Sequence, residues 1–139
     1  MEGDENLTEG RVLVVDDDDD LRRLLESLFT LGGFDTRSVG DGDSAIAETR
    51  VFRPDVVILD IMLPSVDGFE VLRRIREDPD TEGTLVVMLT ALGSDEDVWR
   101  GWQAGADSYV TKPFDIDDLL RIVRRLLEEG SGLSVGGAT

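Results

Sequence analysis

The chain has 139 residues, which suits one domain with a single core, and 40% of them are hydrophobic. It contains no cysteine and no histidine, which excludes disulfides, thiolate ligands and imidazole chemistry by its own side chains. The net charge is −17, from 31 acidic and 14 basic residues, and this opposes direct binding to nucleic acid. Any bound metal must have oxygen ligands, which favours a hard cation.

One globular domain with short tails is the expected organisation. Residues 1–9 are mostly polar and are predicted to form a flexible tail, residues 10–129 the domain, and the glycine-rich residues 130–139 a flexible tail or linker. No apolar run approaches the roughly 18 residues that a membrane span needs, and no leader pattern precedes the domain. We therefore expect a cytoplasmic protein that does not associate with membranes.

The basic residues are almost all of one type. Thirteen of the 14 are arginine, and the single lysine is Lys112. Because every other basic residue is arginine, the lysine at position 112 suggests that this position needs a compact ammonium group. Chance is the alternative explanation.

Residues 11–15 form a nearly continuous apolar run that ends abruptly in five aspartates, residues 16–20. Such runs are typical of parallel strands that are covered on both faces. From Leu21 the apolar residues recur every three or four positions, which predicts a helix. Asp18 or Asp19 can cap its start, and the glycines at 32 and 33 end it.

This strand–helix unit repeats along the chain. Further strands are predicted at residues 34–39, 55–60, 84–89 and 109–111. Further helices are predicted at residues 43–52, from residue 68 onward, at 95–104 and at 115–129. The alternation predicts an α/β protein with a doubly wound parallel sheet. We expect Val51 and Trp99 to face the core, whereas Trp102 fits the core and a partner surface equally well.

Polar residues end the predicted strands. They are Asp16 and Asp17, Asp60, Thr90 and Lys112. Ligands of open α/β sheets bind beyond the carboxyl ends of the strands, so these side chains should converge. Singly, an aspartate after a strand is more often a helix cap; together, the residues suit phosphoryl transfer to a carboxylate.

In that chemistry Asp60 is the candidate nucleophile, which would form an aspartyl phosphate. The three neighbouring carboxylates need a cation, and all-oxygen ligation suits Mg²⁺. Lys112 would neutralise charge on the phosphoryl oxygens, and Thr90 would donate a hydrogen bond to them.

Four segments resemble the response-regulator receiver family of two-component signalling. They are Val14-Val15-Asp16-Asp17, residues 60–68, Thr90-Ala91 and residues 109–114, and the resemblance covers residues 11–129. It implies a flavodoxin-like doubly wound (βα)5 sandwich with strand order 2-1-3-4-5. It also implies a phosphoacceptor switch, which receives its phosphoryl group from a histidine kinase or phosphotransfer protein and catalyses only its own phosphorylation and dephosphorylation.

The resemblance assigns the metal ligands residue by residue. Asp17, Asp60 and the backbone carbonyl of Met62 would bind Mg²⁺ directly, and Asp16 would bind it through a water molecule. Lys112 would pair with Asp60 or its phosphate, and the peptide bond between Lys112 and Pro113 would be cis.

The resemblance also implies how the signal leaves the site. Phosphorylation would draw Thr90 inward and let Tyr109 rotate, which remodels the face formed by the fourth helix, fifth strand and fifth helix for a downstream partner or output domain. One departure concerns an ion pair by which many relatives dimerise through this face. Its two positions are Ser108 and Ile122 here, so the pair is absent, and Asp107 and Arg121 would point elsewhere.

Another class of protein shares part of this pattern. Mg²⁺-dependent phosphohydrolases that use an aspartyl phosphate place the nucleophile after the first strand, and residues 16–20 imitate that arrangement weakly. However, no segment could form the cap that encloses their substrates. We therefore keep the phosphohydrolase as the alternative.

Overall fold

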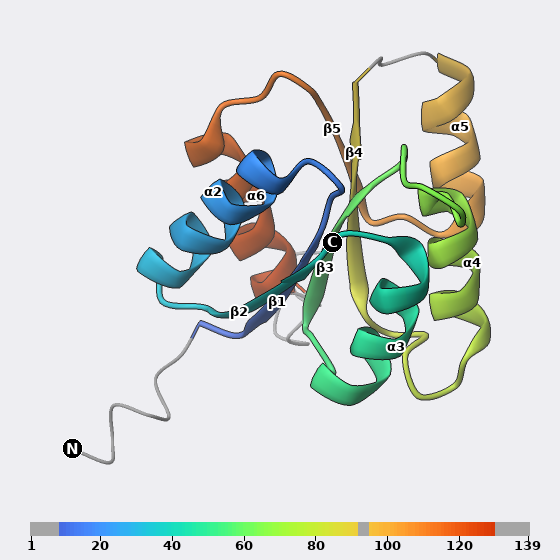
Figure 1. The fold of residues 1–139 in the computed structure, drawn as a ribbon, viewed down its shortest axis with the longest axis horizontal. Coiled ribbons are helices and arrows are strands. Elements are labelled where there is room, and N and C mark those ends of the chain that lie inside the picture. Colours follow the sequence, from blue (N-terminus) through green and yellow to red (C-terminus); the bar gives the residue numbers. More distant parts are fainter. Residues whose placement is uncertain (1–8, 92–94, 130–139) are drawn as a thin grey trace.

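A computed structural model describes residues 9–91 and 95–129 of the chain. Its five strands form one parallel sheet of order β2-β1-β3-β4-β5, as predicted (Figure 1). The strands are β1 (Arg11–Val15), β2 (Asp35–Val39), β3 (Val56–Asp60), β4 (Leu85–Thr90) and β5 (Ser108–Thr111). Because parallel neighbours cannot be joined by tight turns, a helix crosses between successive strands.

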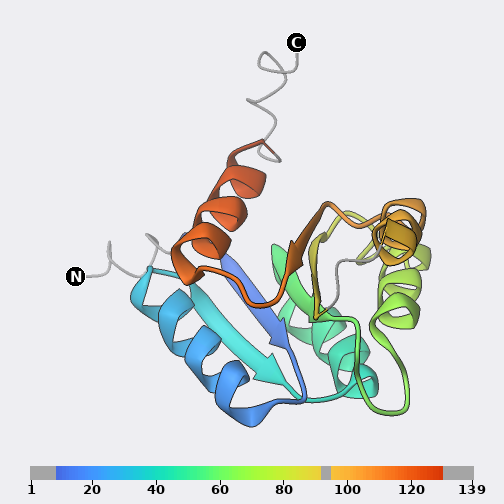
Figure 2. The same ribbon diagram turned by 90° about the horizontal axis from the view of Figure 1, so that it is seen from above.

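The helices cover both faces of the sheet. They are α2 (Asp19–Leu31), α3 (Gly42–Phe52), α4 (Gly68–Glu77), α5 (Asp95–Ala104) and α6 (Ile116–Glu129). Helices α2 and α6 lie on one face, and α3, α4 and α5 lie on the other (Figure 2). The chain is therefore the three-layered, doubly wound sandwich that the sequence predicts.

Two core clusters separate along the central strands. In β3, Val57 and Leu59 pack under α3 and α4, whereas Val56 and Ile58 pack under α2 and α6. Successive side chains of a strand point to opposite faces, so a strand between two helical layers must be apolar at every position. The uninterrupted apolar runs in the sequence have this cause.

Aspartates cap the starts of α2, α3 and α4. The side chain of Asp18 accepts hydrogen bonds from the backbone N–H groups of Asp20 and Leu21 at the start of α2. Asp41 and Asp67 cap α3 and α4 through the N–H groups of Ser44 and Glu70. An N-terminal cap contributes typically about 1 kcal/mol to stability.

Two predictions about the core are wrong. Val51 is 75% exposed, because the buried side of α3 passes through Ala45, Thr49 and Phe52. Trp99 is 63% exposed on α5, and Trp102 on the same helix is 50% exposed. Helical spacing identified an apolar stripe in each case, but only packing decides which side of a helix meets the sheet.

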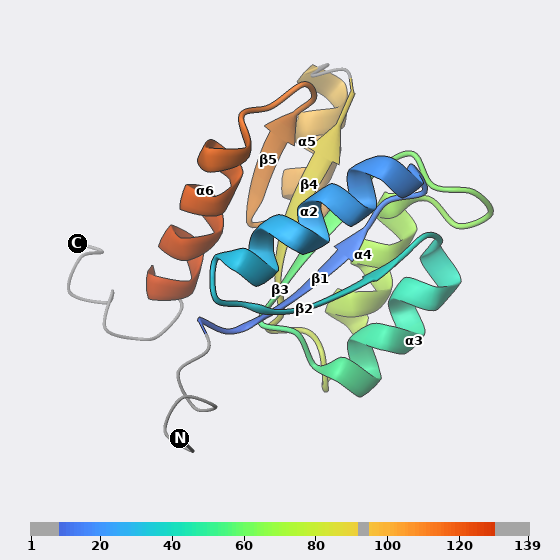
Figure 3. The same ribbon diagram turned by 60° about the vertical axis from the view of Figure 1, so that its left-hand side comes forward.

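The strand order reverses between β1 and β3. From β1 the chain moves outward to β2, and after α3 it returns to β3 on the other side of β1 (Figure 3). The carboxyl ends of β1 and β3 therefore flank a topological switch point, where open α/β sheets bind their ligands.

None of the helices in residues 9–91 and 95–129 is long and apolar enough to cross a membrane. The predicted tails at residues 1–9 and 130–139 lie almost entirely outside the described residues, so their flexibility stays a prediction.

Candidate functional site

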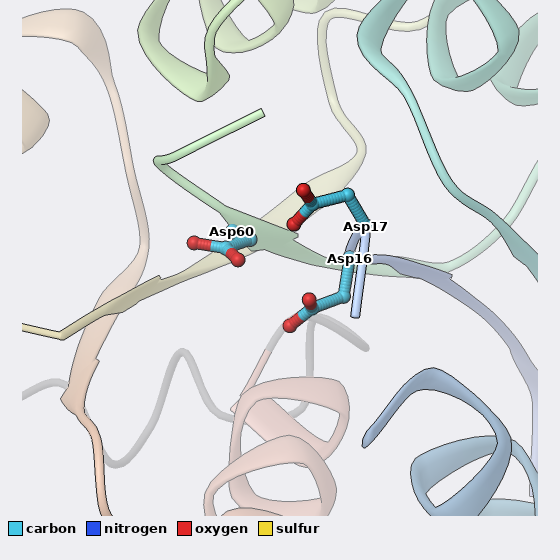
Figure 4. Close-up of side chains that lie close together, drawn as sticks. All are labelled: Asp16, Asp17 and Asp60. Carbon is cyan, nitrogen blue, oxygen red and sulfur yellow. The ribbon is translucent and has the colours of Figure 1, made fainter. Parts of the chain in front are cut away.

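Three carboxylates meet at the switch point. Asp16 and Asp17 follow β1 directly, and Asp60 ends β3 (Figure 4). One carboxylate oxygen from each of the three lies within 4.8 Å of the others. Asp16 and Asp60 are buried, whereas Asp17 is exposed, so this cluster opens to solvent on the Asp17 side.

Asp16 is held from several directions. Its Oδ1 accepts a hydrogen bond of 2.9 Å from the backbone N–H of Asp18, and its Oδ2 accepts one of 3.1 Å from Lys112. The guanidinium of Arg22 donates to its backbone carbonyl at 2.9 Å. Because Asp16 has no exposed surface, the donors from Asp18 and Lys112 take the place of water at its carboxyl oxygens.

Asp60 is 4% exposed, and its carboxylate accepts hydrogen bonds from Met62 and Lys112. The backbone N–H of Met62 donates to Oδ1 at 3.0 Å, and Lys112 donates to Oδ2 at 3.1 Å. Burial raises the pKa of the Asp60 carboxyl above its ordinary value of 3.8, and the Asp16 carboxylate raises it further. The bonds from Met62 and Lys112 oppose the shift without cancelling it.

Lys112, the single lysine, bridges the two buried carboxylates. Its Nζ lies 3.1 Å from an oxygen of Asp16 and 3.1 Å from an oxygen of Asp60. Burial alone would lower the pKa of Lys112, but the bonds to Asp16 and Asp60 outweigh burial and raise it. The ammonium therefore remains charged, and its three donors suit bridging better than a planar guanidinium does.

Backbone geometry brings the Lys112 segment to the site. The N–H of Lys112 donates to the carbonyl of Thr90 at 2.6 Å, which ties the end of β5 to the end of β4. The peptide bond from Lys112 to Pro113 is cis, as the resemblance implies. Thr90 is 3% exposed at the end of β4, and Tyr109 is partly buried on β5.

Gly68 has a positioning role that sequence reasoning missed. A Cβ at this position would lie 2.4 Å from the carbonyl oxygen of Asp60 and 2.7 Å from the Cα of Ile61. The N–H of Gly68 donates to the carbonyl of Ile61 at 2.9 Å. The start of α4 thus packs directly on the backbone that carries Asp60. The sequence feature that could have indicated this role is a glycine immediately after Asp67, the residue that caps α4.

A cavity of about 570 Å³ adjoins the cluster on its exposed side. Asp17, Met62, Phe69 and Arg100 are among the residues that line it. The guanidinium of Arg100 lies 4.0 Å from the centre of the Phe69 ring, so stacking fixes its direction. No motif in the sequence pointed to Arg100, because its position over Phe69 depends on how α5 packs against α4.

The donor set fits a hard divalent cation. It consists of carboxylate oxygens, three of which approach one another closely enough to share an ion. Three carboxylates face a single ammonium, which leaves excess negative charge for a cation to neutralise. Carboxylate ligation with an open side for water and phosphate oxygens is the kind that Mg²⁺ prefers.

Asp107 and Arg121 adjoin in sequence the two positions of the absent ion pair, and both contact other residues, as predicted. Asp107 accepts hydrogen bonds of 2.8 Å from the guanidinium of Arg76 and from the N–H of Val86. Arg121 pairs with Asp118 on its own helix. Ile122, at one of the two original positions, packs against the core beneath α6.

Comparisons with known proteins agree with this geometry. Residues 12–124 match the family model described as the response regulator receiver domain. The DNA-binding dual master transcriptional regulator RpaA of Synechocystis is 43% identical over 117 residues, which cover 84% of this chain and 48% of RpaA. The chain spans about half the length of the curated relatives it matches.

Solved structures are similar over almost their whole length. The Francisella response regulator 1452 receiver domain has 34% identity and a TM-score of 0.79, covering 88% of this chain and 98% of that one. A structure described as the BeF3-activated DrrB receiver domain has 37% identity and a TM-score of 0.77, covering 86% and 97%.

Proposed function

Since the chain belongs to the response regulator receiver domain family, we propose that it is the phosphoacceptor switch of a two-component phosphorelay, with Asp60 as acceptor. One observation carries the proposal. Asp60 is buried at the end of β3, beside Asp16 and Asp17, and Lys112 contacts the carboxylate directly. This arrangement combines a nucleophile, a cation site and a fixed positive charge.

The proposed donor is a phosphohistidine of a histidine kinase or phosphotransfer protein, because this chain has no histidine of its own. A carboxylate oxygen of Asp60 attacks the phosphorus, and an O–P bond forms as the P–N bond to the donor imidazole breaks. The leaving nitrogen keeps the electron pair of the broken bond. The products are an aspartyl phosphate on this chain and the dephosphorylated donor imidazole, so the reaction changes the state of the protein itself.

Mg²⁺ is the proposed cofactor, with Asp17, Asp60 and the backbone carbonyl of Met62 as ligands and Asp16 acting through water. When bound, it would neutralise negative charge on the transferring phosphoryl group. Lys112 already lies beside the acceptor oxygen and can move its ammonium to a phosphate oxygen with little displacement. Thr90, buried at the end of the adjacent strand β4, is the proposed hydroxyl donor.

The proposed output is a change in the surface formed by α5, β5 and α6, through Thr90 and Tyr109. This change would control a downstream protein or an output domain of a longer regulator. Names of relatives such as RpaA describe DNA-binding regulators, but the chain spans only about half their length. With a net charge of −17, this part is not expected to contact DNA itself.

Acetyl phosphate with Mg²⁺, followed by intact-protein mass spectrometry, tests the proposal. Wild type should gain the mass of one phosphoryl group, and hydroxylamine should remove it, as expected for an acyl phosphate. Asp60→Asn should gain nothing. Asp55→Asn is the matched control, because Asp55 lies just before the opposite end of the same strand and should not affect labelling.

An acyl phosphate on the Asp60→Asn variant would show that Asp60 is the wrong acceptor. Steady turnover of small phosphate esters by wild type, lost in Asp60→Asn, would favour the phosphohydrolase instead.

A further inference from the structure

We propose that Trp102 is a positioning residue for Tyr109, holding its ring in the arrangement that belongs to unmodified Asp60. The inference rests on the proposed function, because it concerns the switch that phosphorylation of Asp60 would operate. Trp102 lies on α5 and Tyr109 on β5, the two elements that follow each other at the β5 edge of the sheet (Figure 3).

The two rings are in contact range. Their centroids are 6.3 Å apart and their planes are inclined by 51°. Aromatic pairs in proteins prefer offset-stacked or edge-to-face arrangements with centroids about 4.5–7 Å apart, and they stabilise beyond the area they bury. The tilt of this pair is intermediate between the two arrangements, and its centroid distance lies within that range. Trp102 is half exposed, whereas Tyr109 packs against the core cluster beneath α3 and α4. The indole therefore lies on the outer side of the phenol.

Tyr109 lies on the same face of the sheet as Thr90. The register pairs Met88 of β4 with Tyr109 of β5, and Thr90 follows two residues after Met88. Residues two apart on a strand point to the same face. A movement of the Thr90 side chain toward the site would therefore change the space beside the Tyr109 ring, and a rotation of that ring would alter its contact with Trp102.

The contact between Lys112 and Asp60 indicates which state of the switch the structure represents. The ammonium of Lys112 is bonded to the carboxylate of Asp60, with 3.1 Å between Nζ and Oδ2. A free Asp60 carboxylate makes this contact, so we assign the Trp102–Tyr109 pair of the same structure to the unmodified state. A contact that stabilises only the unmodified state opposes activation. Removing that contact should increase the fraction of molecules in the activated conformation.

The experiment measures binding of beryllofluoride, an analogue of the phosphoryl group, in Mg²⁺ by isothermal titration calorimetry. Trp102→Ala should bind between about twofold and tenfold more tightly than wild type, which is the range expected from one aromatic pair. Trp102→Phe retains a ring and should stay within about twofold of wild type. Trp99→Ala is the matched control, since it removes the other exposed tryptophan of the same helix.

A second measurement needs neither Mg²⁺ nor an analogue. Tyr109 is the only tyrosine in the chain, so its ring signals are identified without assignment in an NMR spectrum of ¹³C-tyrosine-labelled protein. The ring current of Trp102 should displace these signals. Trp102→Ala should shift them, whereas Trp102→Leu should match the alanine variant, which separates ring contact from bulk.

Unchanged tyrosine signals in Trp102→Ala, or beryllofluoride affinity equal to or weaker than wild type in that folded variant, would overturn the inference. Wild type that fails to bind beryllofluoride in Mg²⁺ would instead contradict the proposed function. Circular dichroism shows whether Trp102→Ala is folded. If it is not, the same affinity comparison is made between Trp102→Leu, expected to bind more tightly, and Trp102→Phe.

Discussion

The ammonium of Lys112 lies 3.1 Å from Oδ2 of Asp60, although the two residues are 52 positions apart in the chain. It is also bonded to Asp16, so one positive charge lies between two of the three carboxylates proposed to surround Mg²⁺. The lysine and the metal therefore compete for the same negative charge.

Lys112→Met should strengthen Mg²⁺ binding by about fivefold or more, because like charges about 4 Å apart repel by about 1 kcal/mol even at the dielectric constant of water. Calorimetric titration with MgCl₂ at neutral pH measures the change. Arg124→Met removes a positive charge near Gly32, where its guanidinium contacts the backbone, and should leave the affinity unchanged. Equal or weaker binding by Lys112→Met would show that the ammonium does not oppose the metal.

Asp60→Asn should stabilise the metal-free protein at pH 7 by about 0.5–2 kcal/mol, typical of a single stabilising substitution. The pKa of Asp60 is raised in the folded state, chiefly by burial. At pH values well below 3.8, the ordinary pKa of an aspartate, Asp60 is protonated in both the folded and the unfolded protein. As the pH rises, the unfolded chain loses the proton first, so wild-type stability falls until the pH passes the folded-state pKa.

Urea unfolding in EDTA at several pH values measures this difference, which should disappear at low pH. Asp17→Asn is the control: Asp17 is exposed, so its removal should change stability by less than about 0.5 kcal/mol while weakening Mg²⁺ binding. A stability difference between Asp60→Asn and wild type that is independent of pH would count against the ionised carboxylate as its cause.

Met62→Asn should shorten the lifetime of the aspartyl phosphate by about tenfold, which corresponds to roughly 1.4 kcal/mol of barrier. Met62 lies two residues after Asp60 and is 71% exposed, with its side chain lining the adjacent cavity. A thioether cannot orient a water molecule for attack, whereas an amide can. The family resemblance implies that the side chains two residues after Asp60 and two residues after Thr90 border the approach of this water molecule. The second of them is Leu92, which lies outside the described residues.

The loss of the phosphoryl group is followed by mass spectrometry after excess donor has been removed. Met62→Leu, which is similar in size and equally apolar, should keep the wild-type lifetime. A wild-type half-life of a few seconds that Met62→Asn does not change would contradict this prediction without affecting the assignment of Asp60.

Gly68→Ala should destabilise the fold by about 1–3 kcal/mol, the usual effect of overpacking. The new Cβ would meet the carbonyl oxygen of Asp60 at 2.4 Å, and backbone cannot move aside as a flexible side chain can. Because the displaced backbone carries the acceptor, labelling by acetyl phosphate should slow as well. Gly83→Ala is the matched control, since no atom beyond its own chain neighbours lies within 4 Å of its Cβ position. Equal stability of the two variants would show that α4 tolerates a shift away from Asp60.

Much of the fold could be read from local patterns. The apolar runs before Asp16 and Asp60 identify strands because a doubly covered strand must be apolar at every position. Asp18 was recognisable as a cap, since short acidic side chains satisfy the free N–H groups of a helix start. The strand ends then supplied the chemistry of the site, because parallel strands place their carboxyl ends at one edge.

Other features depended on contacts between distant segments. The sequence could not show that Trp99 faces solvent, that Arg100 stacks on Phe69, or that Trp102 reaches Tyr109. Each depends on the rotation and position of α5 against α4 and β5, which side-chain periodicity within one helix does not determine.

The sequence by itself thus determined the order of elements and the residue types at each strand end, because local periodicity and capping act over a few neighbouring residues. Only the tertiary structure decided which carboxylates are buried, that one ammonium bridges Asp16 and Asp60, and that Asp17 remains open to solvent. Burial and charge pairing are properties of packed surroundings, and they set the pKa of Asp60 in a way that its place in the chain cannot reveal.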